Sequence, residues 1–309
     1  MTNLASMKHL LIAAGLSLAF TALTGRVQAQ APAHYVPGTE GLMGASLPPP
    51  GFYFRDYNLF YVAEQLTDLG GNKIKGAKFD AFVYAQVPRV IWVTNQKILG
   101  GDLGASTLLP FVSQNVAYNQ SNGRYRSETF GVGDLLADGF IAWHPKPFDF
   151  VISEGFYAPT GNSSAPPTTR VGQGFWSNLA TAGVTWNSDA KRSWTVSVLN
   201  RFENSSEQRD TNITPGDAYT LEWGISKSVT RSAAQAIDLG VVGYYQQKVT
   251  GDTGDTGVPN KDRVAGIGPE VDIAFPKAEL GITLRYEYEF IAENRAQGQT
   301  VTLTLTKRF

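Results

Sequence analysis

The sequence predicts an all-β fold: a transmembrane outer-membrane β-barrel of about 12 antiparallel strands that follows a cleaved signal peptide. Three observations predict it. The chain opens with a hydrophobic segment, apolar and polar residues alternate along many later segments, and the last ten residues form an amphipathic strand that ends at Phe309. Strands of such barrels alternate in this way because one face meets lipid and the other meets the lumen.

Residues 1–29 are expected to be a signal peptide. An apolar run at residues 10–20 follows Lys8, and Val27-Gln28-Ala29 provides an acceptable small-x-small cleavage site. The run is shorter than the roughly 20 residues that a spanning helix needs, so a membrane anchor is the less favoured alternative. The mature chain is then expected to begin near Gln30.

Composition excludes several classes of protein. The chain contains no cysteine, which excludes disulfides and thiolate metal sites. Its formal net charge is −1, and removal of the basic signal peptide makes it more negative, so no nucleic-acid partner is expected. No later segment has 18 consecutive apolar residues, so helical spans are not expected. No cofactor and no metal site are predicted, and outer-membrane lipids are the expected surroundings of a barrel.

Residues 30–50 are predicted to be irregular, either a flexible periplasmic leader or a plug inside the barrel lumen. Their many prolines and glycines disfavour a helix or a paired strand, because proline lacks a backbone donor and glycine loses much entropy on ordering. Such a segment is expected to begin in the periplasm and to fold up into the lumen if it is a plug. The plug candidates are Tyr35, Pro37, Gly38, Glu40, Leu42 and Met43.

Residues 51–309 are predicted to form the barrel. Alternation of period two, with turn-forming residues as boundaries, predicts twelve strands. They cover residues 52–66, 78–95, 104–117, 130–143, 148–158, 174–186, 193–203, 218–228, 236–249, 264–275, 279–291 and 300–309. An even number is typical of bacterial single-chain barrels.

The predicted connections alternate in length. Residues 144–147 and 276–278 form short links, whereas the links at 118–129, 159–173, 204–217 and 250–263 are long and polar. Short periplasmic turns and long extracellular loops produce this alternation in outer-membrane barrels. A soluble β-sandwich does not require it.

The last strand is strongly two-sided. Its apolar face carries Val301, Leu303, Leu305 and Phe309, whereas four threonines occupy the other face. Lys307 departs from the pattern, since it lies on the apolar face. We expect the barrel assembly machinery to be a partner that contacts the chain through Phe309.

Period two also predicts which residues face the lumen. The charged candidates are Arg201, Glu203, Glu222, Glu270, Asp272, Arg285, Glu287 and Glu289. For any one of them, an ordinary solvated strand face is the simpler interpretation. The first, second, fourth and fifth strands alternate poorly, and their aromatic residues suggest a partly apolar lumen. The candidates there are Tyr53, Tyr57 and Tyr84, with an error of register or a bulge at Pro88 or Pro110 as the alternative.

No enzyme and no catalytic residue are predicted. A barrel hydrolase needs a serine beside a histidine base, but His34 lies in the irregular leader and His144 in a short turn. Neither histidine is expected at the outer rim. The repeated Asp-Thr-Gly of residues 252–257 is expected to form loop turns, not an aspartic-protease pair or a divalent-cation site.

Several motifs resemble one bacterial family. They are residues 35–38 with 40–41, the Leu-Pro-Pro-Pro-Gly-Phe-Tyr-Phe segment at 47–54, residues 131–136 running into Trp143, residues 159–161 and residues 172–176. Together they resemble proteins described as involved in the meta-pathway of phenol degradation, which are regarded as outer-membrane transporters. The resemblance implies an outer-membrane barrel that takes up small hydrophobic or aromatic solutes, and it implies no catalytic residues.

The sequence therefore favours passive uptake of small hydrophobic, in particular aromatic, compounds linked to phenol-type degradation. A general or ion-selective porin is the first alternative, and it requires a consistently polar lumen. A structural or adhesive barrel, or an outer-membrane hydrolase, is the second. Barrel architecture alone does not distinguish these functions.

Overall fold

The computed structural model describes residues 32–120, 123–163, 170–209, 211–254 and 261–309. The chain divides into two units, residues 1–30 and 31–309, and every described residue belongs to the second. The expected signal peptide and its cleavage site lie outside the described residues, as does the second Asp-Thr-Gly. Among the described residues, no helix has the length and apolar character to cross a membrane.

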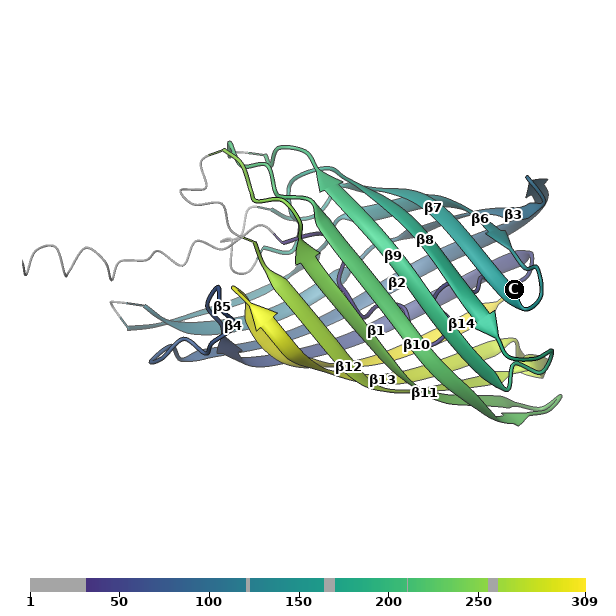
Figure 1. Cartoon of the computed structure of the whole chain (residues 1–309). Helices are drawn as coiled ribbons and strands as arrows, with labels where there is room; N and C mark the ends of the chain where they lie inside the picture. Colours follow the sequence, from purple (N-terminus) through teal and green to yellow (C-terminus); the bar gives the residue numbers. More distant parts are fainter. Residues whose placement is uncertain (1–31, 121–122, 164–169, 210, 255–260) are drawn as a thin grey trace, which may run out of the picture. The chain divides into compact units, whose positions relative to one another are not determined.

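The described part of the second unit is a closed antiparallel sheet with one 3₁₀ turn at Pro276–Ala278 (Figure 1). The strands are β1 (Gly51–Leu66), β2 (Phe79–Ile98), β3 (Gly101–Leu108), β4 (Phe111–Gln120), β5 (Gly123–Val132), β6 (Leu135–Trp143), β7 (Phe148–Ala158), β8 (Ser177–Asn187), β9 (Trp194–Ser205), β10 (Ala218–Arg231), β11 (Ala236–Lys248), β12 (Arg263–Phe275), β13 (Leu280–Glu293) and β14 (Ala296–Arg308). The sheet closes because β1 pairs with both β2 and β14.

These segments form twelve barrel strands. β3 and β4 are two parts of one strand, since both pair with β2 in a continuous register in which Gln86 faces Phe111 and Arg89 faces Leu108. Pro110 interrupts this strand because it has no N–H to donate. β5 and β6 likewise continue one another across residues 133–134, with a shift of one residue in their register against β4 and β3. The prediction of a twelve-stranded antiparallel barrel is therefore confirmed.

The connections differ at the two ends of the barrel. One end, called here the long-loop end, carries the described residues of the connections 159–176, 206–217 and 249–262, and it lies at the left of Figure 1. The other end, the short-turn end, carries the predicted short turns at 144–147 and 276–279 together with the carboxyl terminus. The predicted long loop at 118–129 is wrong, because β4 and β5 extend as a hairpin as far as Gln120 and Gly123. The polar residues of this segment therefore belong to two exposed strands and not to a loop.

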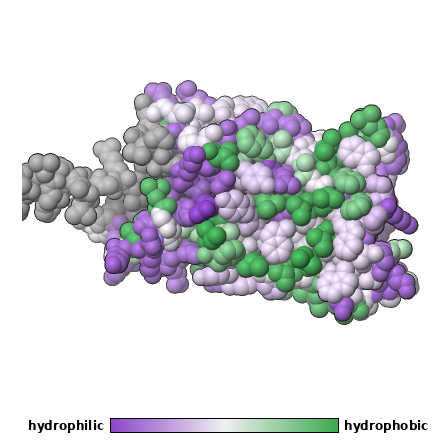
Figure 2. Space-filling view, viewed as in Figure 1, coloured by the Kyte–Doolittle hydropathy of each residue, from purple (hydrophilic) through white to green (hydrophobic). Residues whose placement is uncertain are grey.

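The two faces of the strands differ as period two requires. Along β13, Leu284, Tyr286, Tyr288 and Phe290 are exposed while the residues between them are buried. On the face seen in Figure 2, hydrophobic and intermediate side chains cover the middle of the barrel and hydrophilic residues gather toward its two ends. In the last strand, Lys307 turns its ammonium group to the carbonyl of Ala278 (2.6 Å) at the short-turn end. The outer face is thus suited to lipid, and the protein is an outer-membrane β-barrel.

Candidate functional site

The candidate site is the contact between residues 32–50, called here the leader, and the inner face of the barrel. His34 hydrogen-bonds Ser177, the first residue of β8 at the long-loop end. Ser46 donates to Asp149, the second residue of β7 at the short-turn end (2.7 Å). The leader therefore runs through the lumen with its amino end at the long-loop end. Its other end joins β1 at the short-turn end, and the residues before it lie outside the described part of the chain. His34 lies at the long-loop end, which corrects the expectation that neither histidine is at the outer rim.

The inner wall accepts the backbone N–H groups of the leader. An irregular, proline-rich backbone has no strand or helix partners, so its buried N–H groups need acceptors from elsewhere. Three carboxylates on β9, β10 and β12 supply them. The bonds are His34 N and Tyr35 N to Glu203 (2.8 and 3.0 Å), Glu40 N to Glu222 (3.2 Å) and Leu42 N to Glu270 (2.8 Å).

Glu40 is the leader's main ionic contact. Its carboxylate lies 2.9 Å from Arg89 of β2, 3.4 Å from Arg55 of β1 and 3.7 Å from Arg201 of β9. Its side chain is only 10% exposed, so these three cations act where water screens them little. Glu40 thus links β1 and β2 on one side of the barrel wall with β9 on the opposite side.

Two arginines of the wall contact the leader directly. Arg201 forms an ion pair with Glu222, and its guanidinium lies 4.2 Å from the ring centre of Tyr35. The hydroxyl of Tyr35 donates to the same Glu222 carboxylate (2.7 Å). Arg285 forms an ion pair with Glu270 and donates to the carbonyl of Gly38. The structure therefore brings most of the predicted plug residues against predicted wall residues.

The remaining predicted residues occupy varied positions. Glu287 lies beside the leader, since a Cβ on Gly38 would approach its carboxylate to 2.5 Å. Glu289 accepts from Tyr61 and from the N–H of Gly298, and Asp272 accepts from Thr283. Pro37 and Met43 are half-buried, and the carbonyl of Met43 accepts from Ser46 N (2.9 Å) within the leader.

The aromatic candidates divide between the two faces. Tyr53 and Tyr57 are buried inside, where the hydroxyl of Tyr53 donates to Pro49 O (2.7 Å). Tyr84 was expected to face the lumen, but it lies on the outer face, with its ring centre 4.9 Å from that of the exposed Phe60. The buried residues of β2 have odd numbers, so an even-numbered residue faces outward.

Sequence reasoning missed the glycines that make room for the leader. A Cβ on Gly224 would lie 2.8 Å from the Cα of Leu42, one on Gly240 would lie 2.5 Å from a methyl carbon of Leu42, and one on Gly183 would lie 2.7 Å from the Cβ of Ala45. Leu42 and Ala45 are both 0% exposed. Glycine inside a strand often marks the close approach of another backbone, so these strand glycines are the signal by which the sequence could have indicated the contact with the leader.

The inner face has two unlike sides. Buried apolar residues from β1, β2, β6 and β7 gather around the leader on one side. They include Tyr53, Ile91, Val93, Leu136, Phe140, Val151 and Tyr157. This side also bears the charged Arg55, Arg89, Asp138 and Asp149. The other side, formed by β9 to β13, is more densely charged, since its wall bears Arg201, Glu203, Glu222, Glu270, Arg285, Glu287 and Glu289.

The contacts of His34 superficially resemble a hydrolase triad. Its ring nitrogens lie 2.6 Å from Ser177 Oγ and 3.0 Å from Asp134. The Ser177 hydroxyl, however, donates to Glu203 (2.9 Å), and Ser177 is only 3% exposed. A nucleophile must also meet substrate, and this buried serine lies enclosed against the leader.

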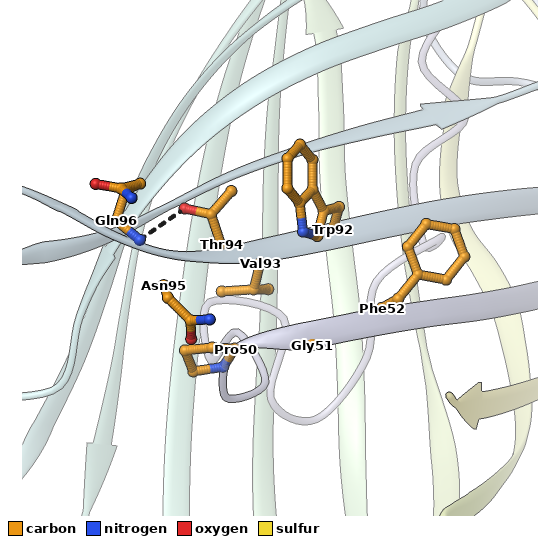
Figure 3. Close-up of a pocket in the computed structure, with 8 residues that line it drawn as sticks. All are labelled: Pro50, Gly51, Phe52, Trp92, Val93, Thr94, Asn95 and Gln96. Carbon is orange, nitrogen blue, oxygen red and sulfur yellow. Dashed lines mark hydrogen bonds between the residues drawn. The ribbon is translucent and has the colours of Figure 1, made fainter.

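Two other features lie apart from the leader. A cavity of about 450 Å³ opens at the short-turn end between β1 and β2, with Phe52 and Trp92 side by side and uncharged residues around them (Figure 3). In the loop after β11, Asp252 pairs with Lys248 and accepts the N–H of Gly216. Within the described ranges, no cluster of three or more histidine or acidic residues is arranged to hold a metal ion.

Comparison with known structures gives the same architecture. The chain is similar to an outer-membrane channel from Pseudomonas putida F1, with a TM-score of 0.73 at 17% identity over 89% of this chain and 100% of that one. The β domain of the autotransporter BrkA of Bordetella gives a TM-score of 0.49 at 14% identity, covering 84% of this chain and 99% of that domain. The translocator domain of NalP from Neisseria meningitidis gives 0.48 at 15% identity, covering 86% and 91%.

Comparison with curated protein sequences gives no match. The family model described as "Putative MetA-pathway of phenol degradation" matches residues 63–305, which is most of the barrel. This agrees with the resemblance seen in the sequence motifs, and the chain belongs to that family.

Proposed function

We propose that this protein is an outer-membrane channel for passive uptake of small aromatic solutes, and that its leader is a plug that closes the lumen. The proposal assigns no catalytic residue, because the serine and histidine that meet in the lumen are engaged in holding the leader. Phe309, which is 73% exposed at the short-turn end, is the proposed contact for the barrel assembly machinery.

The two-sided inner face is the observation that carries the choice of solute. A phenol-type molecule has a flat apolar ring and one polar group. The aromatic and aliphatic side of the lumen suits the ring, whereas the side formed by β9 to β13 offers carboxylates to a hydroxyl donor. Such contacts are individually weak, which conduction requires.

The depth of the leader's burial supports the plug. Its backbone donates to three wall carboxylates, and Glu40 pairs with arginines from three strands. A flexible leader has no reason to bury Leu42 and Ala45 completely. The channel thus conducts when the leader moves.

Uptake into cells tests the proposal. In isogenic cells with and without the protein, a labelled apolar aromatic at low concentration is expected to enter faster when the protein is present, while a small hydrophilic solute enters at an unchanged rate. Faster uptake of both solutes indicates a general porin instead. No change in either indicates a structural or adhesive barrel.

Arg201 and Arg285 test whether the charged wall lines the path. In a protein that lacks residues 30–50, replacing either arginine by alanine is expected to raise the cation-to-anion permeability ratio about twofold, because the neighbouring Glu222 and Glu270 lose their cations. Reversal potentials in a salt gradient measure it. An unchanged ratio in both variants means that these residues do not line the path.

A further inference from the structure

His34, near the amino end of the leader, is enclosed by acceptors. One ring nitrogen lies 3.0 Å from Asp134, and the other lies 2.6 Å from Ser177 Oγ and 3.3 Å from Glu203. The imidazole stacks on Tyr157 with ring centres 4.7 Å apart, and the edge of Phe175 closes the site at 4.5 Å. The side chain is 3% exposed.

A carboxylate lies beside each ring nitrogen, with Asp134 at 3.0 Å from one and Glu203 at 3.3 Å from the other, and this arrangement favours the protonated ring. Both ring nitrogens are donors only in the imidazolium form. Burial acts to lower the pKa of His34, but hydrogen bonds to Asp134 and Glu203 outweigh it and raise that pKa above its usual value.

Asp134 joins this contact to the rest of the long-loop end. Besides His34, its carboxylate accepts the N–H of Gly161 (2.8 Å) and of Gln173 (2.6 Å), which lie near the two ends of the long loop after β7. Residues 131–136, 159–161 and 172–176 were separate motifs in the sequence. The structure brings them together around one carboxylate that also holds the leader.

Among the residues that the structure describes, His34 is the only cation paired with Asp134 and Glu203. Facing His34 are Asp134 from the β5–β6 junction, Tyr157 from β7 and Glu203 from β9, with Tyr35 next along the leader. The nearest arginine of β9, Arg201, is already paired with Glu222 and Glu40. Loss of the imidazolium proton thus leaves two buried carboxylates without their counter-ion.

We propose that His34, Asp134 and Glu203 form a proton-dependent clamp that holds the leader in the lumen and releases it when His34 loses its proton. The inference rests on the proposed function, since it names what regulates the plug. The clamp is fully formed below the usual pKa of histidine, about 6.5. The clamp weakens as the pH rises through the raised pKa of His34, because the protonated ring stabilises the leader only while the leader is bound in the lumen.

A single cysteine at a buried leader position tests the clamp directly. The chain has no native cysteine, so Ala45→Cys carries the only thiol, and a membrane-impermeant maleimide reports when the leader leaves the lumen. The reference is His34→Arg with the same reporter, because arginine keeps its charge at every pH used. Each labelling rate is divided by the reference rate at the same pH, which cancels the ionisation of the thiol.

This ratio is expected to rise by on the order of tenfold between about pH 6 and about pH 9 for the native histidine. His34→Gln, which has no charge, is expected to label fast at both pH values. His144→Gln is the matched control, since that ring is one-third exposed and Arg192 also pairs with its partner Asp149. It should keep the native pH dependence.

A ratio that does not change with pH, or an equal change in His34→Gln, overturns the clamp. Heat-modified migration on gels confirms that each variant has folded. Conductance recorded on the same proteins separates the two proposals. If labelling depends on pH through His34 while conductance stays constant, the clamp stands and the leader's role in closing the channel fails.

Discussion

Deletion of residues 30–50 is expected to convert the protein into a steadily conducting pore, with single-channel conductance in planar bilayers higher by on the order of tenfold. Barrels of about eight strands are filled by their own side chains, and those of sixteen hold water. A twelve-stranded barrel falls between them. Here the leader, with Leu42 and Ala45 fully buried, occupies the space that the wall leaves open.

A shorter deletion, of residues 30–33, is the matched control for this experiment. It removes the chain before His34 but keeps the contacts of Glu40 and Leu42 with the wall. Its conductance should stay close to that of the full protein. If removal of all of residues 30–50 leaves a folded barrel whose conductance is unchanged, the leader does not close the lumen and the plug proposal fails.

The sequence predicts the carboxyl-terminal half of the barrel better than the amino-terminal half, and the structure explains why. From β9 to β13 the inner wall is charged and the outer wall apolar, so alternation is clear. In β1 the inner residues Tyr53 and Tyr57 are aromatic because they meet the leader. Outside, Asp56 accepts from Asn58 and Gln86. Both faces of β1 therefore mix polar and apolar residues.

The path of the leader could not be predicted from the sequence, for another reason. The leader has no regular alternation of apolar and polar residues, so its path depends on tertiary contacts between residues far apart in the chain. Leu42 N and Glu270 are 228 residues apart, for instance, and no local pattern relates them. The sequence predicts the wall residues and the leader residues as two separate sets, and only the folded structure shows which of them are in contact. The direction of the leader follows from the contacts at its two ends, at Ser177 and Asp149.

Glu40→Gln is expected to loosen the leader strongly without harming the barrel. Glutamine keeps the shape of the side chain and the backbone bond to Glu222, but removes the charge that faces Arg55, Arg89 and Arg201. Breaking a buried ion pair from one side costs at least about 3 kcal/mol, so the fraction of open channels should rise roughly a hundredfold. The open probability in bilayer recordings measures it. Thr39→Ala is the control, because the Thr39 hydroxyl donates to Val36 within the leader and not to a described wall residue.

A double-mutant cycle then shows whether the charge acts through Arg89, which is the nearest of the three cations at 2.9 Å. Arg89 also pairs with Asp138, so Arg89→Gln alone leaves that buried acid without its cation. If the contact between Glu40 and Arg89 holds the leader, the two substitutions together should open the channel less than the sum of their separate effects, with a coupling of about 1 to 3 kcal/mol. Additive effects would mean that Glu40 holds the leader through Arg55 and Arg201. An open probability of Glu40→Gln equal to that of the native protein would mean that the charge of the leader does not hold it at all, and that backbone bonds and the buried Leu42 are sufficient.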